Sequence, residues 1–220
     1  MEVNFLQTKL SDLIIDNGLR FDHKYYDFVL KKRFNLITNA KKTIPLKDIL
    51  QPDYIKFNYE EENEYKGLPT AAEYYNENGD IIATQLVTKD EHPDRICLQI
   101  KKGNILISSL KGAKAPVLYF NFEPKDYVAS NGFYVFKVKN SNWDEKFVWY
   151  LLRTNLIRKI LDDHLSSGIG ISSYKESDLL RIKIPLVSLE VQRKALEKII
   201  PLQQKIDIAY SKIESLQDII

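Results

Sequence analysis

The chain has 220 residues, but only one cysteine, Cys97, and only three histidines. A single cysteine excludes an internal disulfide and a cysteine-based metal cluster. No apolar run approaches the roughly 18 residues of a membrane-spanning helix, and residues 1–4 lack the basic start of a signal peptide. We therefore expect a cytoplasmic protein without membrane contact.

Common catalytic patterns are also missing. No glycine-rich loop stands between a strand and a helix, where it would hold nucleotide phosphates. The three histidines, His23, His92 and His164, lie far apart and not at metal-ligand spacing. Gly168 and Gly170 are not followed by the Lys-Ser of a phosphate loop, and no Asn/Asp-Pro-Pro-aromatic string of an amino-methyltransferase is present. We expect no catalytic residue, metal or cofactor.

What the chain does contain is typical of a globular protein with many strands. Hydrophobic residues make up 44% and charged residues 28%, and there are 13 tyrosines and 10 phenylalanines. Such aromatic content suits a β-rich core, and also a surface that stacks or hydrogen-bonds. The net charge of +2 neither requires nor excludes nucleic acid as a partner.

Three parts follow one another along the chain. In residues 1–42, Leu6, Leu10 and Leu13 recur at helical spacing before Gly18, and Asp22 can cap a second helix, which predicts an N-terminal helical segment. Residues 43–187 form the main domain, in which Leu46, Ile49 and Leu50 are expected to turn inward. Residues 188–220 form a long terminal helix.

The main domain is predicted to be an α+β, β-rich domain with packed helices. Asn78-Gly79 indicates a hairpin between strands near residues 73–75 and 81–87. Roughly six to eight short strands are expected in one curved antiparallel sheet. The other expected strands are residues 96–100, 105–108, 117–122, 127–129, 133–138 and 181–184. Helical spacing predicts a helix over residues 144–165, capped by Asn142 or Asp144, and one helical turn in 174–180.

The terminal helix carries an apolar heptad repeat, which is typical of a helix that pairs with another helix. The residues of this seam are Ile199, Leu202, Ile206, Ala209, Ile213, Leu216 and Ile220. Pro201 is expected to kink the helix or to start a new one. Two interpretations remain open: a terminal helix packed on its own domain, or an arm that docks a partner or a second copy.

Two clusters of polar and basic loop residues could meet DNA. Lysines attract phosphates, whereas Ser and Tyr can read base edges. The first cluster is Lys101, Lys102, Ser108, Ser109, Lys111 and Lys114. The second is Ser166, Ser167, Ser172, Ser173, Tyr174 and Lys175. A solvated surface would show the same composition.

One enzymatic alternative is a Mg²⁺-dependent nuclease. Asp53, Glu64 and Lys66 match the spacing of a signature in which two carboxylates hold the metal and a lysine orients water. That hypothesis requires Glu64 and Lys66 on a buried strand, yet they follow the acidic run of residues 60–62.

The order of several strings resembles the DNA specificity subunit of type I restriction-modification systems. The strings are residues 20–26, 44–50, 102–108, Gly112, 150–152, 168–172, 179–186 and 189–193. The family usually has Gly-Asp where this chain has Gly103-Asn104. The family also usually carries two target recognition domains and two long helices, whereas this chain has one of each.

The resemblance implies a non-catalytic, half-size subunit that reads double-stranded DNA. Two copies would pair their terminal helices and read a bipartite site as a homodimer. Methyltransferase subunits, which would flip out an adenine, and a translocating nuclease subunit would be its partners. A further alternative is a decoy that docks through the terminal helix without reading DNA.

Overall fold

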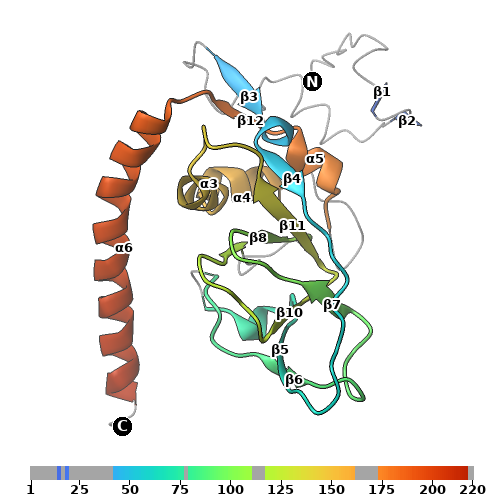
Figure 1. Cartoon of the computed structure of the whole chain (residues 1–220). Helices are drawn as coiled ribbons and strands as arrows, with labels where there is room; N and C mark the ends of the chain where they lie inside the picture. Colours follow the sequence, from blue (N-terminus) through green and yellow to red (C-terminus); the bar gives the residue numbers. More distant parts are fainter. Residues whose placement is uncertain are drawn as a thin grey trace, which may run out of the picture.

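The computed structural model describes residues 14–15, 18–19, 42–76, 79–110, 117–161 and 173–217. Figure 1 shows a β-rich domain with the long helix α6 (Leu189–Gln217) standing beside it. This α+β architecture, with a long C-terminal helix, confirms the predicted fold class.

Most strands belong to two four-stranded sheets. The first has the order β6-β5-β10-β7 and the second β4-β11-β8-β9. The strands of the first sheet are β5 (Tyr65–Leu68), β6 (Gln85–Val87), β7 (Ile96–Gln99) and β10 (Tyr127–Ser130). Those of the second are β4 (Leu50–Pro52), β8 (Ile105–Ser108), β9 (Val117–Tyr119) and β11 (Phe133–Val138).

The two sheets stack because the second sheet carries apolar side chains on both of its faces. In β8, Ile105 and Ile107 pack towards the helices, whereas Leu106 packs with Leu68 and Ala129 of the first sheet. Side chains alternate between the faces of a strand, so such a strand needs cover on both sides. The layers are therefore helices, second sheet and first sheet, with Phe57 and the loop around it on the outer face.

The helices α3 (Glu145–Leu152), α4 (Asn155–Ile160) and α5 (Glu176–Leu180) lie on the second sheet. Asp144 caps α3 as predicted, because its carboxylate accepts a hydrogen bond from the Phe147 amide at 3.0 Å. The helix predicted over 144–165 is divided, because Thr154 caps a new helix by accepting a bond from the Ile157 amide at 3.4 Å.

A short strand pair brings the start and end of the domain together. Strand β3 (Thr43–Pro45) pairs antiparallel with β12 (Lys183–Pro185). The turn η1 (Leu46–Asp48) follows β3. As predicted, Leu46, Ile49 and Leu50 are buried.

The prediction of one antiparallel sheet is wrong. There are two sheets, and β10 pairs parallel with β5 while pairing antiparallel with β7. At the expected hairpin, residues 72–74 form a 3-10 turn, η2 (Ala72–Tyr74), and an isolated bridge pairs Tyr75 with Ile81. Parallel pairing joins distant segments, so local patterns do not reveal it.

Within the predicted N-terminal helical segment, the structure differs at Ile14 and Ile15, which form strand β1 (Ile14–Ile15). This strand pairs antiparallel with β2 (Gly18–Leu19), at the point where the first helix was expected to end. The β-branched side chains of Ile14 and Ile15 favour a strand. The remainder of the segment, including the helix expected after Asp22, lies outside the described residues.

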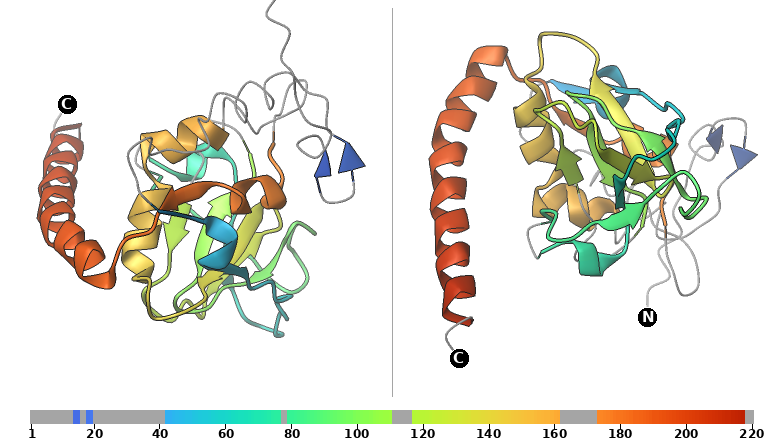
Figure 2. Two further views of the ribbon diagram at one scale, coloured as in Figure 1. Left: turned by 90° about the horizontal axis from the view of Figure 1, so that it is seen from above. Right: turned by 60° about the horizontal axis from the view of Figure 1, so that its bottom comes forward.

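Helix α6 is continuous through Pro201, so the proline does not start a new helix. Its ring leaves the carbonyl of Glu197 without the usual intrahelical donor. Pro201 is exposed, so water can satisfy that carbonyl. The two views of Figure 2 show that α6 runs beside the domain over most of its length.

Candidate DNA-reading and helix-pairing surfaces

The turn between β7 and β8 presents Lys101 and Lys102 to solvent. Gly103 adopts a φ of +88°, which a glycine accepts readily. Asn104 is 2% exposed; its Oδ1 accepts a bond from the Lys101 amide at 2.7 Å, and its Nδ2 donates to Asp53 at 3.0 Å. Buried hydrogen bonds therefore hold the backbone from which the two lysines project.

The two predicted DNA-binding clusters meet at the other end of β8. Leu110 and Ser173 form an antiparallel bridge, and the Tyr174 amide donates to the Ser109 carbonyl at 3.2 Å. The Ser109 hydroxyl donates to the Gly132 carbonyl at 2.8 Å. Ser173 and Lys175 are exposed there. Residues some 65 positions apart in sequence thus share one surface.

Tyr174 supports this junction from inside. It is 4% exposed, and its hydroxyl donates to the carbonyl of Ser108, whose own side chain is buried. Tyr134 donates to the Tyr174 carbonyl at 2.6 Å. Tyr174 and Ser108 are engaged in these contacts, whereas the neighbouring Ser173 and Lys175 are exposed to solvent.

Burial raises the pKa of two tyrosines near this junction. Burial raises the pKa of Tyr54, and the hydrogen bond that its hydroxyl donates to Glu176 raises it further. Burial likewise raises the pKa of Tyr134, with the negative charge of Glu176 adding to the effect. Both hydroxyls therefore keep their protons to a higher pH than an ordinary tyrosine.

The structure divides the first predicted cluster in two. Lys101 and Lys102 precede β8, whereas Ser109 follows it, so they lie at opposite ends of this strand. Four of the predicted contacts lie outside the described residues: Lys111, Lys114, Ser167 and Ser172.

A polar groove near Lys101 was missed by the sequence analysis. It has a volume of about 540 Å³, and its lining includes Lys56, Asn58, Gln99 and Lys125. Burial alternates along residues 53–60, and Lys56 bridges to Leu98, as in a short edge strand. Alternating side chains along residues 53–60 could have indicated this edge strand in the sequence, but the acidic residues that follow suggested a loop.

The three residues of the nuclease alternative are not brought together. Asp53 follows β4 of the second sheet, where it contacts Asn104 and forms an ion pair with Lys137 at 3.5 Å. Lys66 lies on β5 of the first sheet, with its ammonium over the ring of Tyr127, and Glu64 is exposed. Among the described residues, no group of three or more His, Cys, Asp or Glu could hold a metal ion.

Helix α6 presents much of its heptad seam to solvent. Leu202 is 59% exposed and Ile206 is 44% exposed, and Ala209 is also exposed, whereas Ile199 is half-buried. The side of α6 that faces the domain is different: there Gln192 and Leu196 are buried. The seam thus forms an apolar stripe that the domain does not cover. The other seam residues are Ile213, Leu216 and Ile220. Ile213 and Leu216 belong to α6, but the structure describes only their backbone, and Ile220 lies beyond the described residues.

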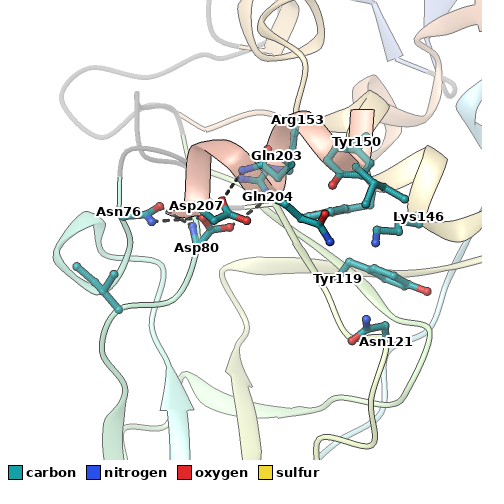
Figure 3. A pocket seen from close by; sticks show the side chains of 13 residues that line it. Asn76, Asp80, Tyr119, Asn121, Lys146, Tyr150, Arg153, Gln203, Gln204 and Asp207 are labelled. Atoms are coloured by element: carbon teal, nitrogen blue, oxygen red, sulfur yellow. Dashed lines mark hydrogen bonds and ion pairs between the residues drawn. The ribbon is translucent and has the colours of Figure 1, made fainter. Parts of the chain in front are cut away.

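Further along α6, a pocket of about 530 Å³ separates the helix from the domain (Figure 3). Gln203, Gln204 and Asp207 of α6 face Tyr150 and Arg153 across it. The Arg153 guanidinium pairs with Asp80 at 3.3 Å and lies 4.6 Å from the centre of the Trp149 ring. Ile82, Trp149 and Ile200 also line this pocket, so this part of the interface is partly polar and partly apolar.

Comparison with known families decides what kind of domain this is. The sequence model of the family described as "Type I restriction modification DNA specificity domain" matches residues 34–218, most of the chain. The chain belongs to this family. Sequence comparison with curated proteins finds no match.

Solved structures share the fold. The HsdS subunit from Thermoanaerobacter tengcongensis has 16% identity and a TM-score of 0.61, over 78% of this chain and 44% of that one. A chain from work on "complex assembly and conformational transition of the type I R-M system" has 17% identity and a TM-score of 0.63, covering 82% and 46%. The S subunit from M. genitalium has 18% identity and a TM-score of 0.50, covering 88% and 47%. The chain therefore spans less than half the length of each.

No helix in the described part of the chain has the length and apolar character needed to cross a membrane. The family and fold together support recognition of DNA sequence by the β-rich domain.

Proposed function

We propose that the chain is the non-catalytic, DNA-reading subunit of a type I restriction-modification system and that it works as a homodimer. The observation that carries this proposal is the uncovered apolar stripe on α6, with Leu202 59% and Ile206 44% exposed. An apolar heptad seam in water is stabilised by burial against a second helix. A second copy supplies an identical seam.

Each protomer would contribute one recognition domain. A two-fold dimer presents two identical domains to the duplex, so it reads two identical half-sites in opposite orientation. The paired α6 helices would act as the spacer between them. The site would therefore be an interrupted palindrome.

The DNA-facing residues in this proposal are the exposed members of the two clusters. Lys101 and Lys102 would contact phosphates from one end of β8, and Ser173 and Lys175 would approach the duplex from the other end. The undescribed members, Lys111, Lys114, Ser167 and Ser172, remain part of the proposal. Ser109 and Tyr174 would hold the junction in shape.

The partners would supply the chemistry. Methyltransferase subunits would flip an adenine out of the site and methylate it, and a nuclease subunit would act on unmodified DNA. In this proposal the chain positions these enzymes on the DNA and takes no part in the chemistry itself.

Sequencing of modified adenines tests this function directly. The chain is co-expressed with the methyltransferase subunit of its own operon in a host without other DNA modification. A split palindrome modified on both strands is the expected result. A split asymmetric motif would contradict the homodimer and indicate a second, different recognition domain, and a stable complex without any motif would indicate the decoy.

A further inference from the structure

The start of α6 is fixed to the domain by one buried polar side chain. Gln192 has no exposed surface. Its Oε1 accepts a hydrogen bond from the Asp144 amide at 2.8 Å, and its Nε2 donates to the carbonyls of Asn142 at 2.9 Å and Val187 at 3.2 Å. The amide group therefore joins the segment before α3, the segment before α6 and α6 itself.

These bonds hold two helix starts in a fixed relation. Asp144 is the residue that caps α3, so its backbone and its side chain are both engaged at this point. Trp143 beside it is buried, as is Leu196 one turn further along α6. A buried side chain with three hydrogen bonds has little freedom to move, because each lost bond would leave a buried polar group unpaired.

Further along, α6 and the domain face each other across a pocket. From Ile200 to Asp207 the helix lines the pocket of Figure 3. Among the described polar side chains of α6, Gln192 is the one that is buried. Loss of its bonds is therefore expected to change the direction of α6 relative to the recognition domain.

A small change of direction at this point has a large effect at the far end. The 21 residues from Gln192 to Ile213 span about 32 Å of helix, so a tilt of about 10° moves the seam by roughly 5 Å. Successive base pairs are about 3.4 Å apart along the duplex. Such a tilt would thus shift one recognition domain by more than a base pair relative to the other.

We propose that Gln192 is a positioning residue: its hydrogen bonds fix the direction of α6 and thereby the number of base pairs between the two half-sites. The inference rests on the proposed function, because a gap exists only if two domains read one split site. Gln192 itself would not touch DNA.

The test varies the gap. A plasmid library carries the two half-sites read by the natural chain, separated by every gap from several base pairs shorter to several longer. Methylation is compared among the natural chain, Gln192→Glu, Gln192→Met and the control Glu197→Gln. The carboxylate introduced by Gln192→Glu would face two carbonyl oxygens. Glu197 is exposed on the same helix, away from the pocket, and receives the reverse exchange of carboxylate for amide.

Both Gln192 variants should modify the same half-site sequence with relaxed spacing. We expect the preference for the natural gap over its neighbours to fall about tenfold, as loss of one buried hydrogen bond implies. Glu197→Gln should keep the natural preference. A uniform loss of methylation at all gaps, with the preference unchanged, would mean a merely structural role and would overturn the inference.

A distance measurement keeps the inference testable if the variants do not methylate. Spin labels are placed at Lys125→Cys in the domain and Lys205→Cys in α6, both exposed, in a Cys97→Ser chain. The distance distribution should broaden or shift in Gln192→Glu and Gln192→Met but not in Glu197→Gln; an unchanged distribution in the Gln192 variants would overturn the inference. If the natural chain directs no split motif, the proposed function fails and the gap-setting role with it. If only the Gln192 effect is absent, the function stands.

Discussion

At the scale of single residues, Asn104 shows why one atom matters. Its side-chain amide donates a hydrogen bond to the Asp53 carboxylate at 3.0 Å. Asn104→Asp would place two carboxylates in contact at a buried site, so we expect the free energy of unfolding to fall by about 2–3 kcal/mol at neutral pH. Denaturant unfolding measures this.

The double variant Asp53→Asn/Asn104→Asp provides the matched control. It restores an amide opposite a carboxylate with the roles exchanged, so it should recover most of the lost stability. Equal stability of Asn104→Asp and the natural chain would contradict this explanation of the Asn104–Asp53 contact.

Tyr59 gives a pH prediction. Burial raises the pKa of Tyr59 to about 12 from its ordinary 10.0; its hydroxyl donates to the Ile96 carbonyl at 2.8 Å. Below pH 10 the phenol is protonated in both states, so its contribution is fully present. Between pH 10 and about 12 the unfolded chain ionises first, and stability should fall as pH rises.

Unfolding by denaturant at several alkaline pH values checks this, with Tyr59→Phe as the comparison. The variant cannot ionise at this position, so its stability should decline less steeply above pH 10. Identical slopes for the two proteins would show that Tyr59 does not contribute.

At the scale of elements, α6 carries the sharpest prediction about assembly. Ile206→Asp combined with Ile213→Asp would bury unpaired charges in a helix pair, so the dimer dissociation constant should rise at least about 100-fold. Analytical ultracentrifugation measures the mass. Ile208→Asp is the control: Ile208 is 56% exposed and lies on another side of the helix from Ile206.

An unchanged dimer mass in the double variant would remove the helix-pairing proposal. Loss of the dimer in Ile208→Asp alone would place the contact on the other face of α6.

Elements with a strong local pattern were predicted well. Strands β8 and β11 have the predicted bounds, because alternating apolar residues are flanked by turns at Gly103 and Gly132. The parallel pairing of β5 with β10 could not be predicted, since it depends on packing between segments about 60 residues apart. The break at Thr154 was missed because the apolar spacing continues across it.

The candidate site was predicted only in part, for a similar reason. Exposed lysines such as Lys102 are recognisable by type. The side chains of Ser108 and Tyr174, in contrast, are both buried, and the Tyr174 hydroxyl donates to the main-chain carbonyl of Ser108 from a distant segment. The sequence does not show whether a hydroxyl group faces water or donates a hydrogen bond to a buried carbonyl. The bridge between Leu110 and Ser173 that joins the two clusters is likewise a property of the fold.

At the scale of the whole molecule, binding to DNA should depend strongly on salt. Each phosphate contact releases counterions, so the slope of log K against log salt changes by about 0.9 per contact. We expect Lys101→Ala and Lys102→Ala each to lower the slope by about that amount per protomer bound, without changing which sequence is preferred. Fluorescence anisotropy with a labelled duplex at several salt concentrations measures it.

Lys194→Ala is the control for this series, since Lys194 lies on α6 and pairs with Glu190 at 2.7 Å. Its slope should equal that of the natural chain. A slope unaffected by loss of Lys101 or Lys102 would remove the turn before β8 from the DNA-facing surface.

The pairing of β3 with β12 also bears on how the protein is made. Thr43 lies about 140 residues before its partner Pro185, and a ribosome adding about 5–20 residues per second needs roughly 7–28 s to cover that interval. During this time the N-terminal strand of the nascent domain has no partner and is open to chaperones. The pairing of β3 with β12 can form only after the segment that leads into α6 has left the ribosome. Each new chain therefore completes this strand pair shortly before α6 leaves the ribosome.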